Sequence, residues 1–279
     1  MSDALAVIDG VRRACREADG HDPLDEAAAL HLKHRGLDGA EVWLADDQGF
    51  ALRRGAEVDL AVAPAFRGHG LGGELAGRAF AGGSATTAWS HGDHPAARVL
   101  AARHDLARAR ELWVMRRAAS APLPELVLPN GLHIRSYRHG DDADVLRVNA
   151  AAFARHPEQG ALDETGLAER KAEPWFDPQG LLLAEDRAGT VLGFHWTKRH
   201  DDRQGEVYVV GIDPAAQGQG LGRLLTLAGL HHLMSGGVDE VILFVESDNT
   251  PAIRVYTGLG FTHAERDTHV QYRRSASGT

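Results

Sequence analysis

Apolar residues follow strand and helix periodicities along the second half of the chain. Short apolar or alternating runs predict strands at 132–137, 181–185, 191–198, 206–213, 240–246 and 261–273. Helical spacing predicts helices at 141–154, 220–235 and 250–259. The strands at 181–185 and 191–198 enclose Arg187-Ala-Gly-Thr190, which predicts a hairpin. This order indicates an α/β (α+β) fold with a mixed, partly antiparallel central sheet flanked by helices.

The first half shows the same order more faintly. Its patterns predict strands at 41–44, 51–53, 58–63 and 86–90, and helices at 71–80 and 95–104. The first half begins almost directly with helical segments, so we expect its opening strand to be missing.

An internal repeat explains this similarity. Leu60-Ala-Val-Ala-Pro64-Ala-Phe-Arg67-Gly-His-Gly-Leu-Gly72 matches Val210-Gly-Ile-Asp-Pro214-Ala-Ala-Gln217-Gly-Gln-Gly-Leu-Gly222 at an offset of 150 residues, from Pro64 to Pro214. Pro95-Ala-Ala-Arg98-Val99 matches Pro251-Ala-Ile-Arg254-Val255 at an offset of 156 residues, from Pro95 to Pro251. Two matches in the same order indicate a duplicated fold.

A proline-rich stretch separates the two copies. Pro122, Pro124 and Pro129 interrupt helices and central strands alike, which predicts a linker at 119–130. The expected domains are therefore 1–118 and 131–279, and a length of 279 residues suits two domains.

Composition and charge narrow the class of protein. With 43% hydrophobic and 25% charged residues the chain is typical of globular proteins, and its net charge of -9 argues against nucleic-acid binding. Cys15 is the single cysteine, no signal-peptide pattern opens the chain, and no apolar run is long enough for a membrane span. We expect a cytoplasmic protein without membrane or nucleic-acid partners. The charge allows a monomer or a dimer; we expect a monomer, because the duplication already supplies an internal pair.

The segment Gln217-Gly218-Gln219-Gly220-Leu221-Gly222 lies between a predicted strand and a predicted helix. Glycines let backbone N–H groups converge on a ligand, and the helix N-terminus adds partial positive charge, which favours an anion. In one copy alone, a simple tight turn would explain the pattern equally well. Neither a Walker lysine nor a Rossmann acidic residue accompanies it.

Together with the downstream Asn249-x-Pro-Ala-x-Arg-x-Tyr256-x-x-Leu-Gly-Phe261, this order resembles the GCN5-related N-acetyltransferases. The resemblance implies that the loop binds the diphosphate of acetyl-CoA, and that the backbone of the preceding strand holds the pantetheine and polarises the acetyl carbonyl. Gly211 inside that strand predicts a β-bulge. The expected acetyl-CoA-binding residues of both copies are Val210, Gly211, Ile212, Gln217, Gly218, Gln219, Gly220, Leu221, Gly222, Arg223, Asn249, Thr250, Pro251, Ala252, Ile253, Arg254, Leu60, Ala61, Val62, Arg67, Gly68, Gly70 and Gly72.

Acetyl transfer to an amine needs a proton acceptor and a proton donor beside the thioester. The resemblance implies Glu206 as the general base and Tyr256 as the general acid. A solvated strand end and a packing aromatic are the plain alternatives. At the repeat offsets the first copy carries Ala56 and Leu100 instead. We therefore expect the first copy to bind acetyl-CoA, or only to shape the acceptor site, without turnover.

The whole chain resembles the mycothiol synthase family through His156-Pro-Glu-Gln-Gly160, Trp175-Phe-Asp-Pro178, Gly193-Phe-His-Trp-Thr-Lys198, Gly205-Glu-Val-Tyr-Val-Val-Gly211 and Val245-Glu-Ser-Asp-Asn249. That resemblance implies a cysteinyl-glucosaminyl-inositol acceptor contacted by Glu26, Glu158, Lys198 and Glu206. Phe244 stands where the family can offer a tyrosine hydroxyl. Glu26 is equally explained as a helix-dipole residue.

Two other interpretations remain open. The chain could acetylate another small amine or a protein N-terminus. It could also be a non-catalytic acyl-CoA sensor, which Glu206 and Tyr256 argue against. No metal site is expected, because His231 and His232 are adjacent on a helix and diverge, and no His-Glu-x-x-His is present. His91, His94 and His104 are expected to be surface or cap residues.

Overall fold

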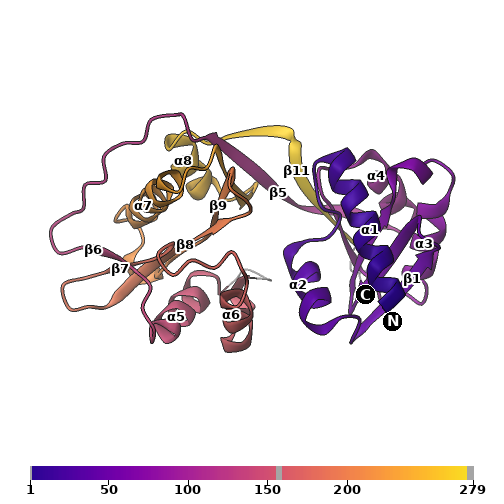
Figure 1. The fold of residues 1–279 in the computed structure, drawn as a ribbon, viewed down its shortest axis with the longest axis horizontal. Helices are drawn as coiled ribbons and strands as arrows, with labels where there is room; N and C mark the ends of the chain where they lie inside the picture. The colour runs from indigo at the N-terminus through magenta and orange to yellow at the C-terminus, as the bar shows by residue number, and fades with distance from the viewer. Residues whose placement is uncertain (1, 155–158, 275–279) are drawn as a thin grey trace, which may run out of the picture. The chain divides into compact units, whose positions relative to one another are not determined.

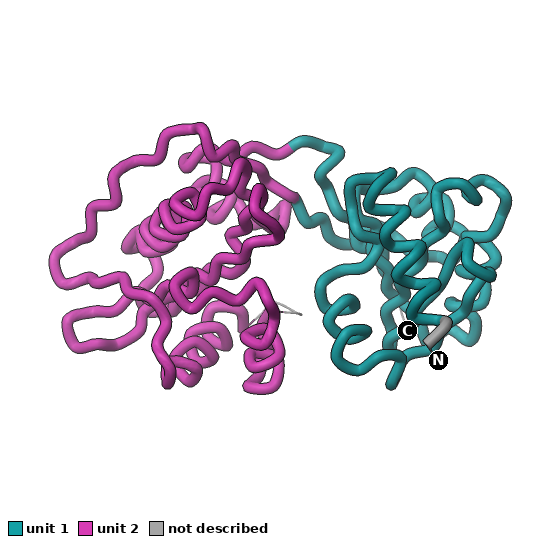
Figure 2. The backbone as a smooth tube through the Cα atoms, viewed as in Figure 1, with its two compact units in different colours: residues 1–113, 264–279 teal, residues 114–263 magenta. Residues whose placement is uncertain are grey.

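The computed structural model describes residues 2–154 and 159–274. The chain forms two compact units, unit 1 from residues 1–113 and 264–279 and unit 2 from residues 114–263 (Figure 2). The end of the last strand thus belongs to unit 1, where Val270–Arg273 pair antiparallel with Thr87–Ser90. The units therefore differ from the ranges 1–118 and 131–279 expected for the two domains.

Unit 1 is an open sheet with helices on both faces. Its elements are α1 (Ser2–Asp19), α2 (Glu26–Arg35), β1 (Ala40–Ala45), β2 (Gly49–Arg54), β3 (Glu57–Val62), η1 (Pro64–Phe66), α3 (Leu71–Ala79), β4 (Thr87–Ser90), α4 (Pro95–Arg103), the first part of β5 (Leu106–Ala118) and most of β11 (Thr262–Arg274) (Figure 1). Strands β1, β2 and β3 are antiparallel neighbours, and β3 pairs parallel with β4. The first described element of unit 1 is the helix α1.

Alternation along β2 divides the core of unit 1 between the two sheet faces. Phe50 and Leu52 pack with α1 and α2, whereas Ala51 packs with α3. Successive side chains of a strand point to opposite faces, so each face needs its own helical cover.

Unit 2 repeats this plan around a longer helix. Its elements are β6 (His133–Ser136), α5 (Asp142–Ala152), η2 (Gln159–Ala161), α6 (Glu164–Lys171), β7 (Leu181–Glu185), β8 (Val191–Arg199), β9 (Gln204–Ile212), η3 (Pro214–Ala216), α7 (Leu221–Ser235), β10 (Glu240–Glu246) and α8 (Thr250–Gly258). The strand order is β5-β10-β9-β8-β7-β6, in which β9 and β10 are parallel. The predicted mixed α/β fold is confirmed. Helix α6 and strand β5 were not predicted, and no described helix has the length and apolarity of a membrane span.

The predicted linker at 119–130 contains no helix or strand, and a buried arginine ties its start to unit 2. Arg117 is 2% exposed. Its guanidinium donates to the carbonyl oxygens of Leu259 at 2.8 Å, Ala121 at 2.7 Å and Pro122 at 3.0 Å. Burial without a carboxylate partner lowers the pKa of Arg117. The chain is therefore fixed where it leaves β5.

We expect Arg117→Met to destabilise the protein by about 3 kcal/mol, because the thioether fills the space but leaves buried carbonyl groups without donors. Urea unfolding followed by tryptophan fluorescence measures this loss. Arg116→Met is the matched control: Arg116 is 31% exposed and pairs with Glu240 at 2.9 Å, so about 1 kcal/mol or less is expected. Equal midpoints for the two variants would contradict the role given to Arg117.

Candidate functional site

Strands β9 and β10 run together for only part of their length. Gln204–Val207 pair with Glu240–Leu243, and within the described chain no pair joins the two strands beyond that point, although β9 continues to Ile212 and β10 to Glu246. The backbone edge of β9 that faces β10 is therefore open. Such an edge can pair with an extended ligand as it would with another strand.

A β-bulge marks the point of separation. In the β8–β9 ladder Trp196 pairs with Val209 while Thr197 pairs with Val207, so Tyr208 is the extra residue. A bulge bends its strand and increases its twist, which turns β9 away from β10. The bulge predicted at Gly211 is wrong, because Gly211 pairs in register with Phe194. The glycine is needed for packing instead, since a Cβ atom there would lie 2.6 Å from Cε1 of Phe194.

The glycine loop follows β9 directly and opens α7. Gly218 and Gly220 have φ angles of +79° and +78°, a region that L side chains rarely adopt. Gly220 is the N-cap of α7 and offers no side-chain hydrogen bond, so the first N–H groups of the helix stay available. Leu221 is buried, and Gln217 donates to the carbonyl oxygen of Ile212 at 3.5 Å. The loop therefore presents mainly backbone, which suits an anion.

The second predicted cofactor segment lies at the start of α8. Asn249 caps this helix by accepting the N–H of Ala252 at 3.2 Å, and the predicted residues from Thr250 to Arg254 form its first turns. Because β9 and β10 are parallel, the helices that follow them begin at the same edge of the sheet, where ligands of open α/β sheets bind (Figure 1). Both predicted segments therefore lie at that edge, on either side of the opening.

Tyr256 lies on α8, between one and two turns after its first residue, Thr250. Its ring packs edge-on against Phe261 with centroids 6.0 Å apart. Its hydroxyl has no hydrogen-bond partner among residues 2–154 and 159–274. Burial raises the pKa of Tyr256 to about 12. The phenol is therefore protonated at neutral pH, so that it can donate a proton.

Glu206 lies on β9 just before the bulge and is buried. A carboxylate only accepts hydrogen bonds, so Nε2–H of His200 donates to Oε2 of Glu206, at 2.6 Å. His200 was not predicted from the sequence. Opposite Glu206 on β8 stands Lys198, whose ammonium lies 4.8 Å from the ring of Trp175 and 5.2 Å from that of Tyr208. These cation–π contacts orient the lysine beside the carboxylate.

The other predicted acceptor contacts fall in different places. Phe244 is 39% exposed on β10, two residues beyond Ile242, which pairs with Glu206. Residues two apart on a strand share a face, so Phe244 projects from the same side as Ile242. Glu26 is the first residue of α2, in unit 1. Glu158 lies outside the described residues.

The first copy of the glycine loop, in unit 1, keeps the backbone geometry of the second, but its arginine is already held by other groups of unit 1. Gly68 and Gly70 have φ angles of +82° and +92°, and Gly70 is the uncapped start of α3. Arg67 donates to the carbonyl oxygen of Val62 at 2.9 Å, as Gln217 does to Ile212, and also pairs with Asp19 at 2.6 Å. The guanidinium is thus already neutralised.

The rest of the first copy lacks the features of the second. Strands β3 and β4 pair only at Glu57 and Val58, so they also separate, but the β2–β3 ladder is regular and has no bulge. Leu60, Val62 and Leu100 pack against the apolar core on the side of α3 and α4. The position of Tyr256 is therefore occupied by an apolar side chain in apolar surroundings.

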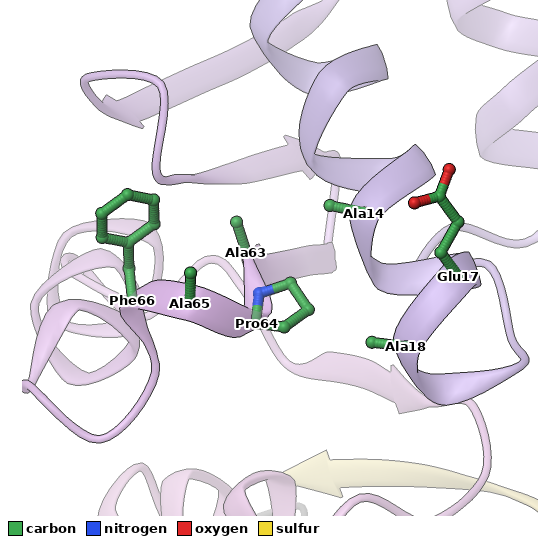
Figure 3. A pocket seen from close by; sticks show the side chains of 7 residues that line it. All are labelled: Ala14, Glu17, Ala18, Ala63, Pro64, Ala65 and Phe66. Carbon is green, nitrogen blue, oxygen red and sulfur yellow. The ribbon is translucent and has the colours of Figure 1, made fainter.

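An open hollow of about 490 Å³ lies beside the first loop (Figure 3). Ala14, Glu17 and Ala18 of α1 line one side, and 63–66 line the other. It offers a single carboxylate and otherwise small or apolar side chains. The hollow therefore lacks the groups that acetyl transfer requires.

The histidines form no metal cluster in the described chain, where no three His, Cys, Asp or Glu side chains converge. His231 contacts the carbonyl oxygen of Pro124 at 3.0 Å, and His232 contacts Asp177 at 2.9 Å. His94 and His104 are caps of α4, as predicted.

His91, expected at the surface or as a cap, is half-buried and contacts a second histidine. Its Nδ1 lies 3.0 Å from Nδ1 of His269, so that one nitrogen donates and the other accepts. Burial lowers the pKa of His91. The reason is the return of β11 to unit 1, which brings His269 from the other end of the chain.

Two parallel strands that separate at a bulge, a glycine loop opening the next helix and a protonated tyrosine on the following helix define an acetyltransferase of the GNAT class. The Acetyltransferase (GNAT) family pattern matches residues 150–261. The chain is 26% identical to a GCN5-related N-acetyltransferase from Sphaerobacter thermophilus, with a TM-score of 0.72 over 96% of this chain and 92% of that one. A tandem GNAT protein from the clavulanic acid biosynthesis pathway shares the fold, with a TM-score of 0.69 and 16% identity over 99% and 97% of the two chains.

Two mycothiol acetyltransferases are closer in sequence than these structures. A mycothiol acetyltransferase from a Nocardioides species is 58% identical, over 98% of each chain. That of Nocardia farcinica is 51% identical, over 95% of this chain and 91% of the relative. The chain belongs to the mycothiol acetyltransferase family.

Proposed function

We propose that the chain transfers the acetyl group of acetyl-CoA to the cysteinyl amine of 1D-myo-inositol 2-(L-cysteinylamino)-2-deoxy-glucopyranoside, the last step of mycothiol biosynthesis. The observation that carries the chemistry is the open edge of β9 between the bulge at Tyr208 and the glycine loop. The substrate assignment rests on the names of the relatives and on their identity with this chain over nearly its whole length.

Acetyl-CoA would bind along the opening between the two strands. The diphosphate would accept hydrogen bonds from backbone N–H groups of the loop from Gln217 to Arg223, with the start of α8 on the other side. The pantetheine amides would pair with the open edge of β9 near Val210, Gly211 and Ile212, and backbone N–H groups there would polarise the thioester carbonyl.

Acetylation of an ammonium group removes two protons from nitrogen and adds one to the departing sulfur. Glu206 takes a proton from the acceptor ammonium, and the free amine attacks the thioester carbon. As the N–C bond forms and the C–S bond breaks, Tyr256 donates its proton to the departing sulfur. Its pKa of about 12 keeps that proton on the phenol until the thiolate develops. As the tetrahedral intermediate collapses, the second proton leaves the attacking nitrogen and restores the Tyr256 phenol, so the products are the amide, CoA and one proton, which Glu206 releases to solvent.

The acceptor would lie on the side of Glu206 and Lys198. An inositol and a glucosamine ring carry many hydroxyl groups, which suit a carboxylate acceptor and an ammonium donor. The exposed ring of Phe244 offers an apolar contact on β10, without the tyrosine hydroxyl that the family can supply there. Glu26 and Glu158 are the further proposed contacts.

We infer a monomeric, cytoplasmic enzyme that uses no metal in catalysis. Glu206 and Tyr256 account for the proton transfers, so the mechanism requires no Lewis acid. In unit 1, the neutralised Arg67 and the apolar Leu100 support a first copy that does not turn over.

A panel of amines tests the assignment. CoA formation, quantified by chromatography because the acceptor itself carries a thiol, should be faster by a factor of at least about 100 for cysteinyl-glucosaminyl-inositol than for an aminoglycoside or a peptide N-terminus, since unpaired buried polar groups penalise the wrong substrates. The acceptor without its inositol serves as the control for narrow specificity. Equal rates with and without inositol would overturn the substrate assignment and leave the acetyltransferase chemistry standing.

A further inference from the structure

His200 stands at the end of β8, and its ring reaches back to the carboxylate of Glu206. The Glu206 side chain is 6% exposed and that of His200 is 33% exposed. We propose that His200 is the positioning residue of the general base: its Nε2–H holds one carboxylate oxygen of Glu206 and leaves the other to face the acceptor amine. This inference rests on the proposed function, because it assigns His200 to the group that takes the proton.

The hairpin between β8 and β9 presents the ring in this place. Lys198 lies opposite Glu206 in the ladder, and the backbone N–H of His200 donates to the carbonyl oxygen of Gln204 at 3.0 Å. His200 is therefore a diagonal neighbour of Glu206 on the same face of the hairpin. The Asp201 side chain accepts two backbone N–H groups of the turn, at 2.7 and 2.8 Å. The turn is thus fixed, and the histidine with it.

Neighbouring donors on this face are engaged elsewhere. Gln204 donates to Glu240 at 3.0 Å, and the Lys198 ammonium lies over the rings of Trp175 and Tyr208. In the described part of the chain, the hydrogen bond to Glu206 comes from His200. Burial alone favours the neutral form of a carboxyl group, whereas a donor favours the ionised form that can accept a proton. His200 therefore orients the base for proton transfer.

The acceptor ammonium gives one proton to the free oxygen of Glu206, while the imidazole keeps its Nε2 proton throughout. The carboxylic acid then releases the proton to solvent after the product leaves. His200 touches no reacting atom in this step.

His200→Phe and His200→Gln test the proposal in the full-length enzyme. With Phe we expect kcat/KM for the acceptor to fall about 10- to 100-fold at neutral pH, the range of a lost hydrogen bond to a charged group, and the acid limb of its pH profile to move to higher pH. The KM for acetyl-CoA should not change. Gln, whose amide can donate in place of Nε2–H, should restore most of the rate and return the limb toward its original position.

Two controls separate a positioning role from a structural one. His231→Phe changes an exposed histidine that contacts a linker carbonyl, and should leave rate and profile unchanged. In a Glu206→Gln background, His200→Phe should cause no further loss, because a residue that acts through Glu206 has nothing left to position. A uniform loss at every pH, without rescue by Gln, would mean that His200 only supports the fold and would overturn the inference.

The outcomes also distinguish this inference from the proposed function. If Glu206→Gln is inactive while His200→Phe keeps the wild-type rate and profile, the positioning role is wrong and the base assignment stands. If Glu206→Gln retains full activity, the base assignment itself is wrong.

Discussion

Replacing Tyr256 by phenylalanine is expected to lower kcat by about 100- to 10,000-fold, the range of a lost general acid. The ring packs against Phe261, so we expect the phenylalanine ring of the variant to keep the position of the tyrosine ring. The hydroxyl has no partner among the described residues, so its loss breaks no hydrogen bond of that part of the chain. The KM for acetyl-CoA should therefore stay within a few-fold of the wild type. Steady-state CoA formation measures both constants.

The raised pKa of Tyr256 also predicts how the rate loss of Tyr256→Phe depends on pH. A group whose pKa is raised to about 12 stays protonated below that value. Deprotonation of Tyr256 therefore does not lower the wild-type kcat near neutral pH. The factor by which Tyr256→Phe lowers kcat should be constant from about pH 6 to pH 9. Tyr272→Phe is the control, since it removes a hydroxyl that donates to Asp93 in unit 1 at 3.1 Å. A kcat for Tyr256→Phe equal to that of this control would exclude the phenol as the acid.

Glu206→Gln is expected to lower kcat/KM for the acceptor by about 100- to 10,000-fold, because the amide has the shape of the carboxylate but cannot take a proton. The kcat/KM that remains in Glu206→Gln should rise with pH as more of the acceptor amine becomes neutral in solution. The wild-type kcat/KM should reach its plateau at a lower pH. The pH profile of kcat/KM, measured with saturating acetyl-CoA, separates these two behaviours.

A second glutamate provides the control for Glu206. Glu240 starts β10, pairs with Gln204 in the ladder, and is held by Arg116 and by Gln204. Glu240→Gln should change kcat/KM by less than about 3-fold, since its bonds are structural and about a third of the side chain is exposed. Similar losses in both variants would show that the effect comes from the sheet and not from proton transfer.

Several features of this protein could be predicted from the sequence because they depend on residues close together in the chain. The glycine loop needs positive φ angles at Gly218 and Gly220, and the strand before it and the helix after it follow from local periodicity. The duplication was visible because both copies keep this local pattern. Tyr256 was implied by the family resemblance of the motif from Asn249 to Phe261, which is itself a local pattern.

Other features depend on contacts between residues that are distant in the chain. The bulge was expected at Gly211, where the glycine suggested it, but the register against β8 puts it at Tyr208. The β8–β9 ladder also brings His200 to Glu206.

In the sequence, Arg117 looks like any polar residue of a strand. Its burial depends on carbonyl groups that the end of α8 and the linker supply in the folded protein. The return of β11 to unit 1 likewise requires a partner strand from the other half of the chain. The sequence by itself thus determined most of the elements, the duplication and the loop, because backbone preference is local. Only the tertiary structure decided the position of the bulge, the pairing of His200 with Glu206 and the return of β11 to unit 1. Strand register and burial arise only when distant segments pack together.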